Sequence, residues 1–341
     1  MYLAIIDCGT TNSRVYIVNA RGEIAARASR KLGTRDVVIS SSNEILRNGL
    51  EGIFYSALEH ADLELRDIAF VISSGMITSE IGLIEIPHLW APVHIDDLAR
   101  NIEKVHDLSV FPVDIDLYLV RGIKNQYDPQ KAHIADVGDL DFMRGEETQI
   151  AGLLATYDVE FPITVVIFSS HTKFVSIDKD GSILGSLTTL SGQLYEAIIR
   201  ETSIGKSLIS DDDSGNEHYF DRKVVHIAYE WVRRSGFTRA MLMPRFLDVL
   251  LKTKWYERKL FVEAAIASED MRVIDRFNAL NFPLDTNFIL CGSERRCAIY
   301  DYLLREKVKI KRNILAITSI EDIDMLNVKG AIYIAKTAGL I

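Results

Sequence analysis

Hydrophobic and polar positions in the first segment of the chain form a strand-and-turn pattern. Residues 2–7, 14–19 and 23–29 are short apolar runs typical of strands, and polar turns separate them. The second turn contains Gly22, as expected for a hairpin. The first turn, "DCGTTN", holds more hydroxyl side chains than a chain reversal requires. We therefore expect this turn to bind a ligand.

The following segments alternate between helix and strand. Apolar positions from Leu46 to Ala57 have helical spacing, and Ser41 and Glu44 match a capping box ahead of them. Residues 68–76 are a nearly continuous apolar run, which is typical of a parallel strand buried on both faces. The other elements expected here are a helix over 95–105, a strand over 116–120, and a loop that enters a helix over 143–155.

The pattern restarts after "FPITVVIF". Residues 164–189 again give strand, polar turn, strand, glycine-containing turn and strand, so they match residues 4–29. Asp7 aligns with Phe168 in this repeat, although a chance similarity of two hairpins is the alternative. The later elements expected are helices near 190–200, 221–234, 257–279 and 329–338, strands near 287–292 and 314–317, and an exposed acidic loop over 211–217.

A duplicated α/β unit that starts with a hairpin predicts two domains. We expect them to cover residues 1–158 and 159–341, with a cleft between the two hairpin turns. Ligands of open α/β proteins bind beyond the carboxyl ends of the strands, where both turns are expected.

Composition narrows the class of protein. The net charge of −9 and the pI near 5.5 argue against nucleic acid or an anionic membrane as a partner. No apolar run approaches the roughly 20 residues of a membrane-spanning helix, and the N-terminus lacks the basic region of a signal peptide. Cys8, Cys291 and Cys297 lack metal-ligand spacing, so we expect buried, reduced thiols in a cytoplasmic protein.

The first turn has the chemistry of a phosphate site. Gly9 lets the backbone approach a phosphate, and the turn offers backbone N–H groups and the hydroxyls of Thr10, Thr11 and Ser13 as donors. Asp7 at the strand end is suited to Mg²⁺, directly or through water, because Mg²⁺ prefers oxygen ligands. An ordinary polar turn is the alternative.

Two later turns add to this interpretation. The turn "SSHTK" brings Ser170, Thr172 and the cationic Lys173 to the corresponding end of the second hairpin. The segment "CGSERR" places Gly292 and Ser293 at a strand-to-helix turn, where a nucleotide can lie against bare backbone.

Three motifs resemble one known family. They are "FMRGEETQIAGL" (142–153), "SSGMITSEIGLIEIPHLWAP" (73–92) and "SHTKF" (170–174). Together they resemble the 2-keto-3-deoxygalactonate kinases, which belong to the actin-like superfamily with its two-lobed, ribonuclease H-like α/β fold. The resemblance spans nearly the whole chain, and "RGEETQ" is its most specific part.

The resemblance implies an activity: ATP- and Mg²⁺-dependent phosphorylation of the terminal hydroxyl of an open-chain keto-deoxy sugar acid, with 2-dehydro-3-deoxygalactonate going to its 6-phosphate. It also implies a role for Asp7 in holding Mg²⁺, and for Arg144 in pairing with the substrate carboxylate. The remaining implied residues are Gly9, Thr10, Thr11, Asn12, Ser170, Thr172, Gly292 and Ser293 for the nucleotide, His171 and Lys173 for catalysis, and Ser74, Met76, Glu146 and Glu147 for the substrate.

Simpler roles exist for some of these residues. Glu146 and Glu147 also suit the first turn of a helix, where the macrodipole favours carboxylates, and His171 also suits a turn that it caps. The partners implied are ATP and a small sugar acid, and a homodimer is left open.

The second hairpin departs from the family pattern. Ser169 stands where the family has glycine, Gln193 where it has glutamate, and Leu250 where an arginine is expected. These departures motivate an alternative: a catalytically weak or silent sensor of nucleotide or sugar acid on the same fold. Another actin-like ATPase is a third, weaker alternative.

Overall fold

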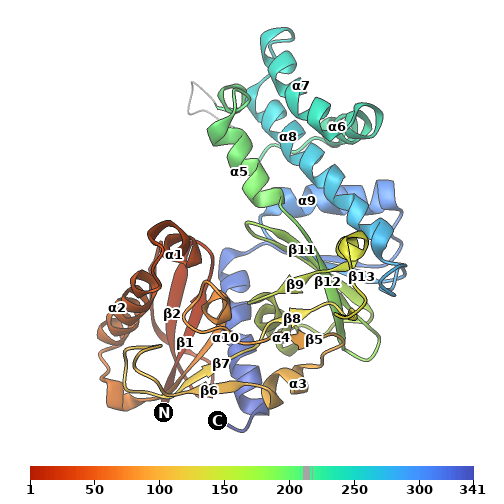
Figure 1. The fold of residues 1–341 in the computed structure, drawn as a ribbon. Coiled ribbons are helices and arrows are strands. Elements are labelled where there is room, and N and C mark those ends of the chain that lie inside the picture. The colour runs from red at the N-terminus through yellow and green to blue at the C-terminus, as the bar shows by residue number, and fades with distance from the viewer. Residues whose placement is uncertain (210–215, 217) are drawn as a thin grey trace. The chain divides into compact units, whose positions relative to one another are not determined.

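The chain forms two compact units. The computed structural model describes residues 1–209, 216 and 218–341 (Figure 1). Unit 1 comprises Met1–Val159, Gly181–Ser186 and Glu321–Ile341, and unit 2 comprises Glu160–Asp180 and Leu187–Ile320. Both units are discontinuous in sequence, and the boundary expected after residue 158 stays a prediction. The exposed loop expected over 211–217 lies almost entirely outside the described residues.

Unit 1 is built on a six-stranded sheet with the order β3-β2-β1-β4-β7-β6, and a small sheet β5-β8-β9 accompanies it. Its elements are β1 (Tyr2–Cys8), β2 (Ser13–Asn19), β3 (Ile24–Arg30), α1 (Thr34–Ser40), α2 (Glu44–Ala61), β4 (Ile68–Gly75), β5 (Leu89–Trp90), α3 (Ile95–Arg100), β6 (Glu103–Val105), β7 (Leu117–Leu119), β8 (Ile123–Lys124), β9 (Phe142–Met143), α4 (Glu146–Thr156) and α10 (Ile320–Thr337).

The apolar pattern explains the position of each strand in this sheet. The nearly continuous apolar runs β1 and β4 are its central, parallel pair, whereas β3 lies at the edge and is mostly exposed. Helix α2 covers one face of the sheet (Figure 1). Its predicted apolar face is confirmed, because Leu46, Leu50, Ile53, Phe54 and Ala57 are all buried. Each large side chain there contributes about 1.5–3 kcal/mol by leaving water.

Unit 2 repeats the topology of unit 1. Its sheet has the order β12-β11-β10-β13-β14, which corresponds to β3-β2-β1-β4-β7, so the predicted duplication is confirmed. Its elements are β10 (Ile163–Phe168), β11 (Thr172–Ile177), β12 (Ile183–Thr189, which begins in unit 1), α5 (Ser191–Glu201), α6 (Arg222–Ser235), α7 (Phe237–Val249), α8 (Trp255–Asp270), β13 (Asn287–Cys291), α9 (Glu294–Leu303) and β14 (Ile314–Ile317).

Two local predictions in unit 1 are wrong. The capping box of Ser41 and Glu44 does not form, because Ser41 ends α1 in a left-handed conformation and Ser42 Oγ accepts the Glu44 N–H instead. The helix expected over 95–105 ends at Arg100, and its last residues form strand β6, which pairs with β7. A neighbouring strand edge thus outweighs local helix preference there.

Several helices of both units also differ from expectation. Helices α1 and α7 were not expected, and α7 contains Pro244, a residue that argues against a helix interior. Helix α8 ends at Asp270 and continues as a 3₁₀ turn, Met271–Arg276, whereas α10 begins at Ile320, well before the expected start.

Helices α4 and α10 of unit 1 cross at two glycines. A Cβ placed on Gly330 would lie 1.8 Å from the Thr148 carbonyl oxygen, and one on Gly152 would lie 1.9 Å from the Leu326 carbonyl oxygen. The two backbones therefore touch directly. This crossing fixes the start of α4 against α10, and both helices supply residues to the site described below.

We predict that Gly330→Ala lowers the free energy of unfolding by about 3 kcal/mol, because the methyl group has no space at the crossing. The matched control is Gly52→Ala in α2, where a Cβ meets nothing within 4 Å. Alanine should there stabilise by up to about 1 kcal/mol through helix propensity. Denaturant unfolding measures both changes, and equal stability of the two variants would contradict the proposed crossing.

Candidate active site

The carboxyl end of β1 holds Asp7 in a network within unit 1. Arg14 Nη1 on β2 donates to Asp7 Oδ2 at 3.2 Å, and Asn327 Nδ2 on α10 donates to the same oxygen at 3.1 Å. Among the described residues, none donates a hydrogen bond to Asp7 Oδ1. One carboxylate oxygen is thus fixed in place, and the other is left for a ligand.

The surroundings of Asp7 favour a cation. Burial raises the pKa of Asp7, the Arg14 guanidinium opposes this shift, and the carboxylates of Asp324 and Glu146 add to it. Asp324 and Glu146 thus add negative charge around Asp7, whose ion-pair partner is Arg14. An additional positive charge beside Asp7 would lower the cost of keeping its carboxylate ionised.

Glycines bring three chain segments together beside Asp7. Gly75, the last residue of β4, has φ +88, and a Cβ on it would lie 2.4 Å from the Cys8 carbonyl oxygen. Gly145, just before α4, has φ +105, and its Cβ would lie 3.3 Å from the Gly75 Cα. Both the backbone conformation and the space require glycine. The ends of β1 and β4 and the start of α4 consequently meet at one point.

The turn after Asp7 exposes backbone donors. Its Gly9 N–H bonds the Asn12 carbonyl at 2.9 Å, and the Thr10 carbonyl accepts the Arg35 N–H at 2.9 Å. Among the described residues, no oxygen accepts a hydrogen bond from the N–H groups of Thr10 and Thr11. Such a turn is suited to binding an anion. The Ser13 hydroxyl, expected to be another donor to phosphate, is buried and donates to the Leu32 carbonyl at 2.8 Å instead.

The two glutamates at the start of α4 differ in their environments. Glu147 is completely buried, and its two carboxylate oxygens accept the Gly145 N–H at 2.8 and 2.9 Å. Burial, with a further contribution from the Glu146 charge, raises the pKa of Glu147 to about 8. Glu146 is only partly buried, and its Oε2 accepts the Arg144 N–H at 3.1 Å. The helix-start role therefore fits Glu147, and Glu146 is the glutamate accessible to a ligand.

Arg144 binds the loop that follows β4. Its Nη1 donates to Thr78 Oγ1 at 2.6 Å, and its Nη2 donates to the Ile86 carbonyl at 2.7 Å and lies 3.3 Å from His88 Nδ1. Burial lowers the pKa of Arg144. Both terminal nitrogens thus have protein acceptors, and the pairing with a substrate carboxylate stays a prediction. Of the other predicted substrate residues, Ser74 is buried and Met76 is partly buried.

The second hairpin turn, in unit 2, is more enclosed than the first. Thr172 is completely buried, and its hydroxyl accepts from Arg296 Nη2 at 2.8 Å. Lys173 is also buried, and the Ser170 carbonyl accepts the Gln193 N–H at 2.8 Å. Ser170 Oγ lies 3.3 Å from His171 Nδ1. The roles predicted for these side chains toward ATP stay predictions.

Arg296, which was not among the predicted site residues, lies beside this turn on α9. Its guanidinium carbon lies 4.9 Å from the centre of the Phe168 ring. Phe168 also explains why position 292 is a glycine, because a Cβ on Gly292 would lie 2.5 Å from Phe168 Cδ2. The pattern "CGSERR" does contain Arg296, but its position on the turn depends on the pairing of β10 with β13, which sequence alone does not give.

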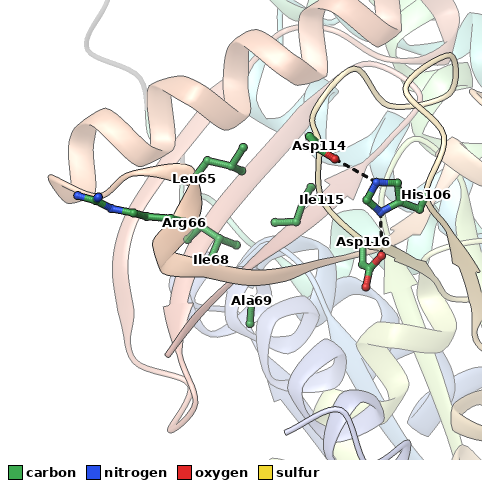
Figure 2. Close-up of a pocket in the computed structure, with 8 residues that line it drawn as sticks. All are labelled: Leu65, Arg66, Ile68, Ala69, His106, Asp114, Ile115 and Asp116. Atoms are coloured by element: carbon green, nitrogen blue, oxygen red, sulfur yellow. Dashed lines mark hydrogen bonds and ion pairs between the residues drawn. The ribbon is translucent and has the colours of Figure 1, made fainter.

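A cavity of about 580 Å³ lies at a different place in unit 1 (Figure 2). It is lined by Leu65, Arg66, Ile68, Ala69, His106, Asp114, Ile115 and Asp116. Figure 2 shows the His106 ring between the two aspartates. Its Nε2 lies 3.1 Å from Asp114 Oδ1, and its Nδ1 lies 2.9 Å from Asp116 Oδ1. Ile68 of this lining begins β4, and Gly75, which contacts Gly145, ends it. The length of this strand separates the cavity from Gly75 by about 20 Å. None of the predicted site residues lines it.

The residues around Asp7 fit Mg²⁺. Within the parts of the chain that the structure describes, no three His, Cys, Asp or Glu side chains form a metal-binding cluster. Mg²⁺, however, keeps several waters and needs only one or two carboxylates. Asp7 Oδ1 is a suitable oxygen, and Asn327 Oδ1 is buried without a hydrogen-bond partner. Both are the hard donors that this ion prefers.

Solved structures share this fold. A candidate 2-dehydro-3-deoxygalactonokinase from Sinorhizobium meliloti is 20% identical, with a TM-score of 0.70 and coverage of 98% of both chains. Component A of (R)-2-hydroxyglutaryl-CoA dehydratase from Acidaminococcus fermentans is 15% identical, with a TM-score of 0.51 and coverage of 99% of both chains. The chain therefore has the actin-like α/β fold that was predicted.

Comparison of the sequence with protein families assigns the chain to one family. The sequence profile of the 2-keto-3-deoxy-galactonokinase family matches residues 7–316. The chain belongs to this family, so the resemblance found in its motifs is confirmed, and the protein is a sugar kinase. No curated protein sequence matches the chain. The alternative of a silent sensor has no support from the family match.

Two other expectations bear on the class of protein. All three cysteines are buried and none forms a disulfide, as expected. Among the described residues, no helix has both the length and the apolar character needed to cross a bilayer.

We predict that Glu147 makes the enzyme less stable as pH rises from about 4.5 to about 8. The Glu147→Gln variant should lack this part of the pH dependence. In this window the unfolded chain has released the Glu147 proton and the folded chain still holds it, so the rising pH favours unfolding. The difference in Tm, variant minus native, should therefore increase with pH. A difference that stays constant across the window would contradict burial of a protonated Glu147.

Proposed function

We propose that the enzyme transfers the terminal phosphoryl group of ATP to the terminal hydroxyl of 2-dehydro-3-deoxygalactonate and forms the 6-phosphate. Family membership supports the reaction and the substrate class. One observation carries the proposal. Asp7, the Gly9–Asn12 turn and the start of α4 come together where Gly75 contacts Gly145. Phosphoryl transfer requires mainly positioning and charge stabilisation, and these groups can supply both.

The phosphate-binding part of the proposal uses the first turn and Asp7. The free N–H groups of Thr10 and Thr11 would bind phosphate oxygens, with Gly9 and Asn12 shaping the turn. Asp7 would hold Mg²⁺ through Oδ1, directly or through water, while Arg14 and Asn327 keep its carboxylate in place. When bound, Mg²⁺ neutralises charge on the phosphates.

We assign to Glu146 the role of general base for the attacking hydroxyl of the substrate. Its carboxylate is accessible and close enough to Asp7 to raise the pKa of that residue. It would accept the hydrogen bond of the substrate hydroxyl and take its proton as the bond to phosphorus forms. Glu147 is excluded from this role because its oxygens bind Gly145 inside the helix start.

The substrate would lie near the loop that Arg144 holds. Ser74 lies near the end of β4 and Met76 begins this loop, and Arg144 binds its Thr78 and Ile86. For the nucleotide we keep the predicted residues Ser170, Thr172, Gly292 and Ser293, and add Arg296. His171 and Lys173 keep their predicted catalytic role toward the phosphates.

We predict that Asp7→Asn lowers kcat/KM for phosphorylation by about 10²- to 10³-fold, the usual loss when a preorganised electrostatic group is removed from a transition state. Asparagine keeps the acceptor for Arg14, so the fold should survive. A coupled assay of ADP release over a panel of keto-deoxy sugar acids measures the effect.

The control for this variant is Asp96→Asn on α3, an exposed residue that pairs with Arg100. It should retain native activity. Native-like activity of the Asp7 variant would remove Asp7 from the site. Absence of turnover by the native enzyme on every acid of the panel would refute the proposed substrate class.

A further inference from the structure

One face of the small sheet β5-β8-β9 carries an aromatic and cationic row. Trp90 pairs with Lys124 across β5 and β8, and Lys124 pairs with Phe142 across β8 and β9. Cross-strand partners lie on the same face of a sheet, so these three side chains are neighbours. Ile123 and Met143, which point to the other face, are buried.

The row remains open to solvent in unit 1. Phe142 is 61% exposed and Trp90 is 37% exposed. Lys124 Nζ lies only 3.7 Å from the centre of the Trp90 ring, and the Tyr127 ring packs edge-on against Trp90 at 4.9 Å. The Trp90 ring thus fixes the orientation of the long Lys124 side chain.

A second row connects this face with the proposed site. His88, Gly122 and Arg144 lie side by side, because a Cβ on Gly122 would be 2.7 Å from both His88 Cδ2 and Arg144 Cγ. Arg144 is two residues from Glu146 along the chain. The His88 ring also contacts the Phe142 ring at 5.3 Å between centres, so this partly buried second row lies between the face of Lys124 and the start of α4.

The two cations of this face differ in their bonding. The terminal nitrogens of Arg144 already donate to the loop after β4. Lys124 has three N–H donors, and the Trp90 ring is an electrostatic contact that satisfies at most one of them. No carboxylate among the described residues forms an ion pair with Lys124, in contrast to the nearby Lys131, which pairs with Asp128 at 3.2 Å. Lys124 is the cation with donors to spare.

We propose that Lys124 binds the carboxylate of the sugar-acid substrate, with Trp90 and Phe142 packing against its carbon chain. This inference rests on the proposed function, which supplies an acid with one carboxylate and an extended chain. An ammonium–carboxylate pair beside an aromatic ring is partly shielded from water, which strengthens it. Lys124 would then select acids over neutral sugars, while Arg144 keeps the adjoining loop in position.

The test compares Lys124→Met with the matched control Lys131→Met, an exposed lysine of the same unit. Calorimetry measures binding of 2-dehydro-3-deoxygalactonate and of its neutral amide, and the coupled assay measures KM and kcat. The Lys124 variant should bind the acid about 10- to 100-fold more weakly, the range for a lost hydrogen bond to a charged group, with kcat largely kept. Its binding of the amide should stay within about twofold of native, as should all values for the control. Lys124→Arg should restore most of the affinity for the acid.

The outcomes separate this inference from the proposed function. Native turnover of the acid together with unchanged binding by Lys124→Met overturns the role of Lys124 alone. Equal losses for the acid and the amide overturn it as well, because they indicate a general disturbance of the face. Binding of the acid without any turnover by the native enzyme refutes the kinase reaction but still tests Lys124, and no binding at all overturns both.

Discussion

The site in unit 1 depends on the direct contact of backbones at Gly75. Its missing side chain lets the end of β4 lie against the Cys8 carbonyl, and it lets Gly145 approach from the start of α4. A methyl group at Gly75 would separate β1 from β4 at the point where Asp7 and the following turn leave the sheet. The glycine crossing of α4 with α10 serves the same purpose from the other side, because it positions Asn327 to donate to Asp7. Four segments distant in sequence thus form one site through contacts that only glycine permits.

The acidic residues of this site differ in burial, and their proposed roles differ accordingly. Glu147 is enclosed, and its oxygens accept the Gly145 N–H at the start of its own helix. Asp7 and Glu146 keep access to ligands, and the Glu146 charge contributes to the raised pKa of Asp7. The two hairpin turns differ in a similar way. The first leaves N–H groups of Thr10 and Thr11 without acceptors, whereas the second is tied to Arg296 and Gln193.

The sequence predicted much of this arrangement because the signals are local. The hairpin repeat, the buried strand over 68–76 and the apolar face of α2 follow from hydrophobic spacing, and the run "RGEETQ" identified the family. Asn327 could not be found this way, since it meets Asp7 from 320 positions along the chain. The row of Trp90, Lys124 and Phe142 was missed for another reason: its strands are two residues long and too short for a periodic pattern. The capping box at Ser41 failed because a neighbouring serine met the same donor.

In the proposed reaction, the end of β1 and its turn bind the metal and phosphates of ATP. The most direct measurement is a crystal structure of the enzyme with Mn²⁺ in place of Mg²⁺, a non-hydrolysable ATP analogue and the sugar acid, with the anomalous signal used to locate the metal. We expect a manganese peak beside Asp7 Oδ1 and phosphate oxygens on the N–H groups of Thr10 and Thr11. A peak remote from Asp7, with the triphosphate bound away from this turn, would contradict it.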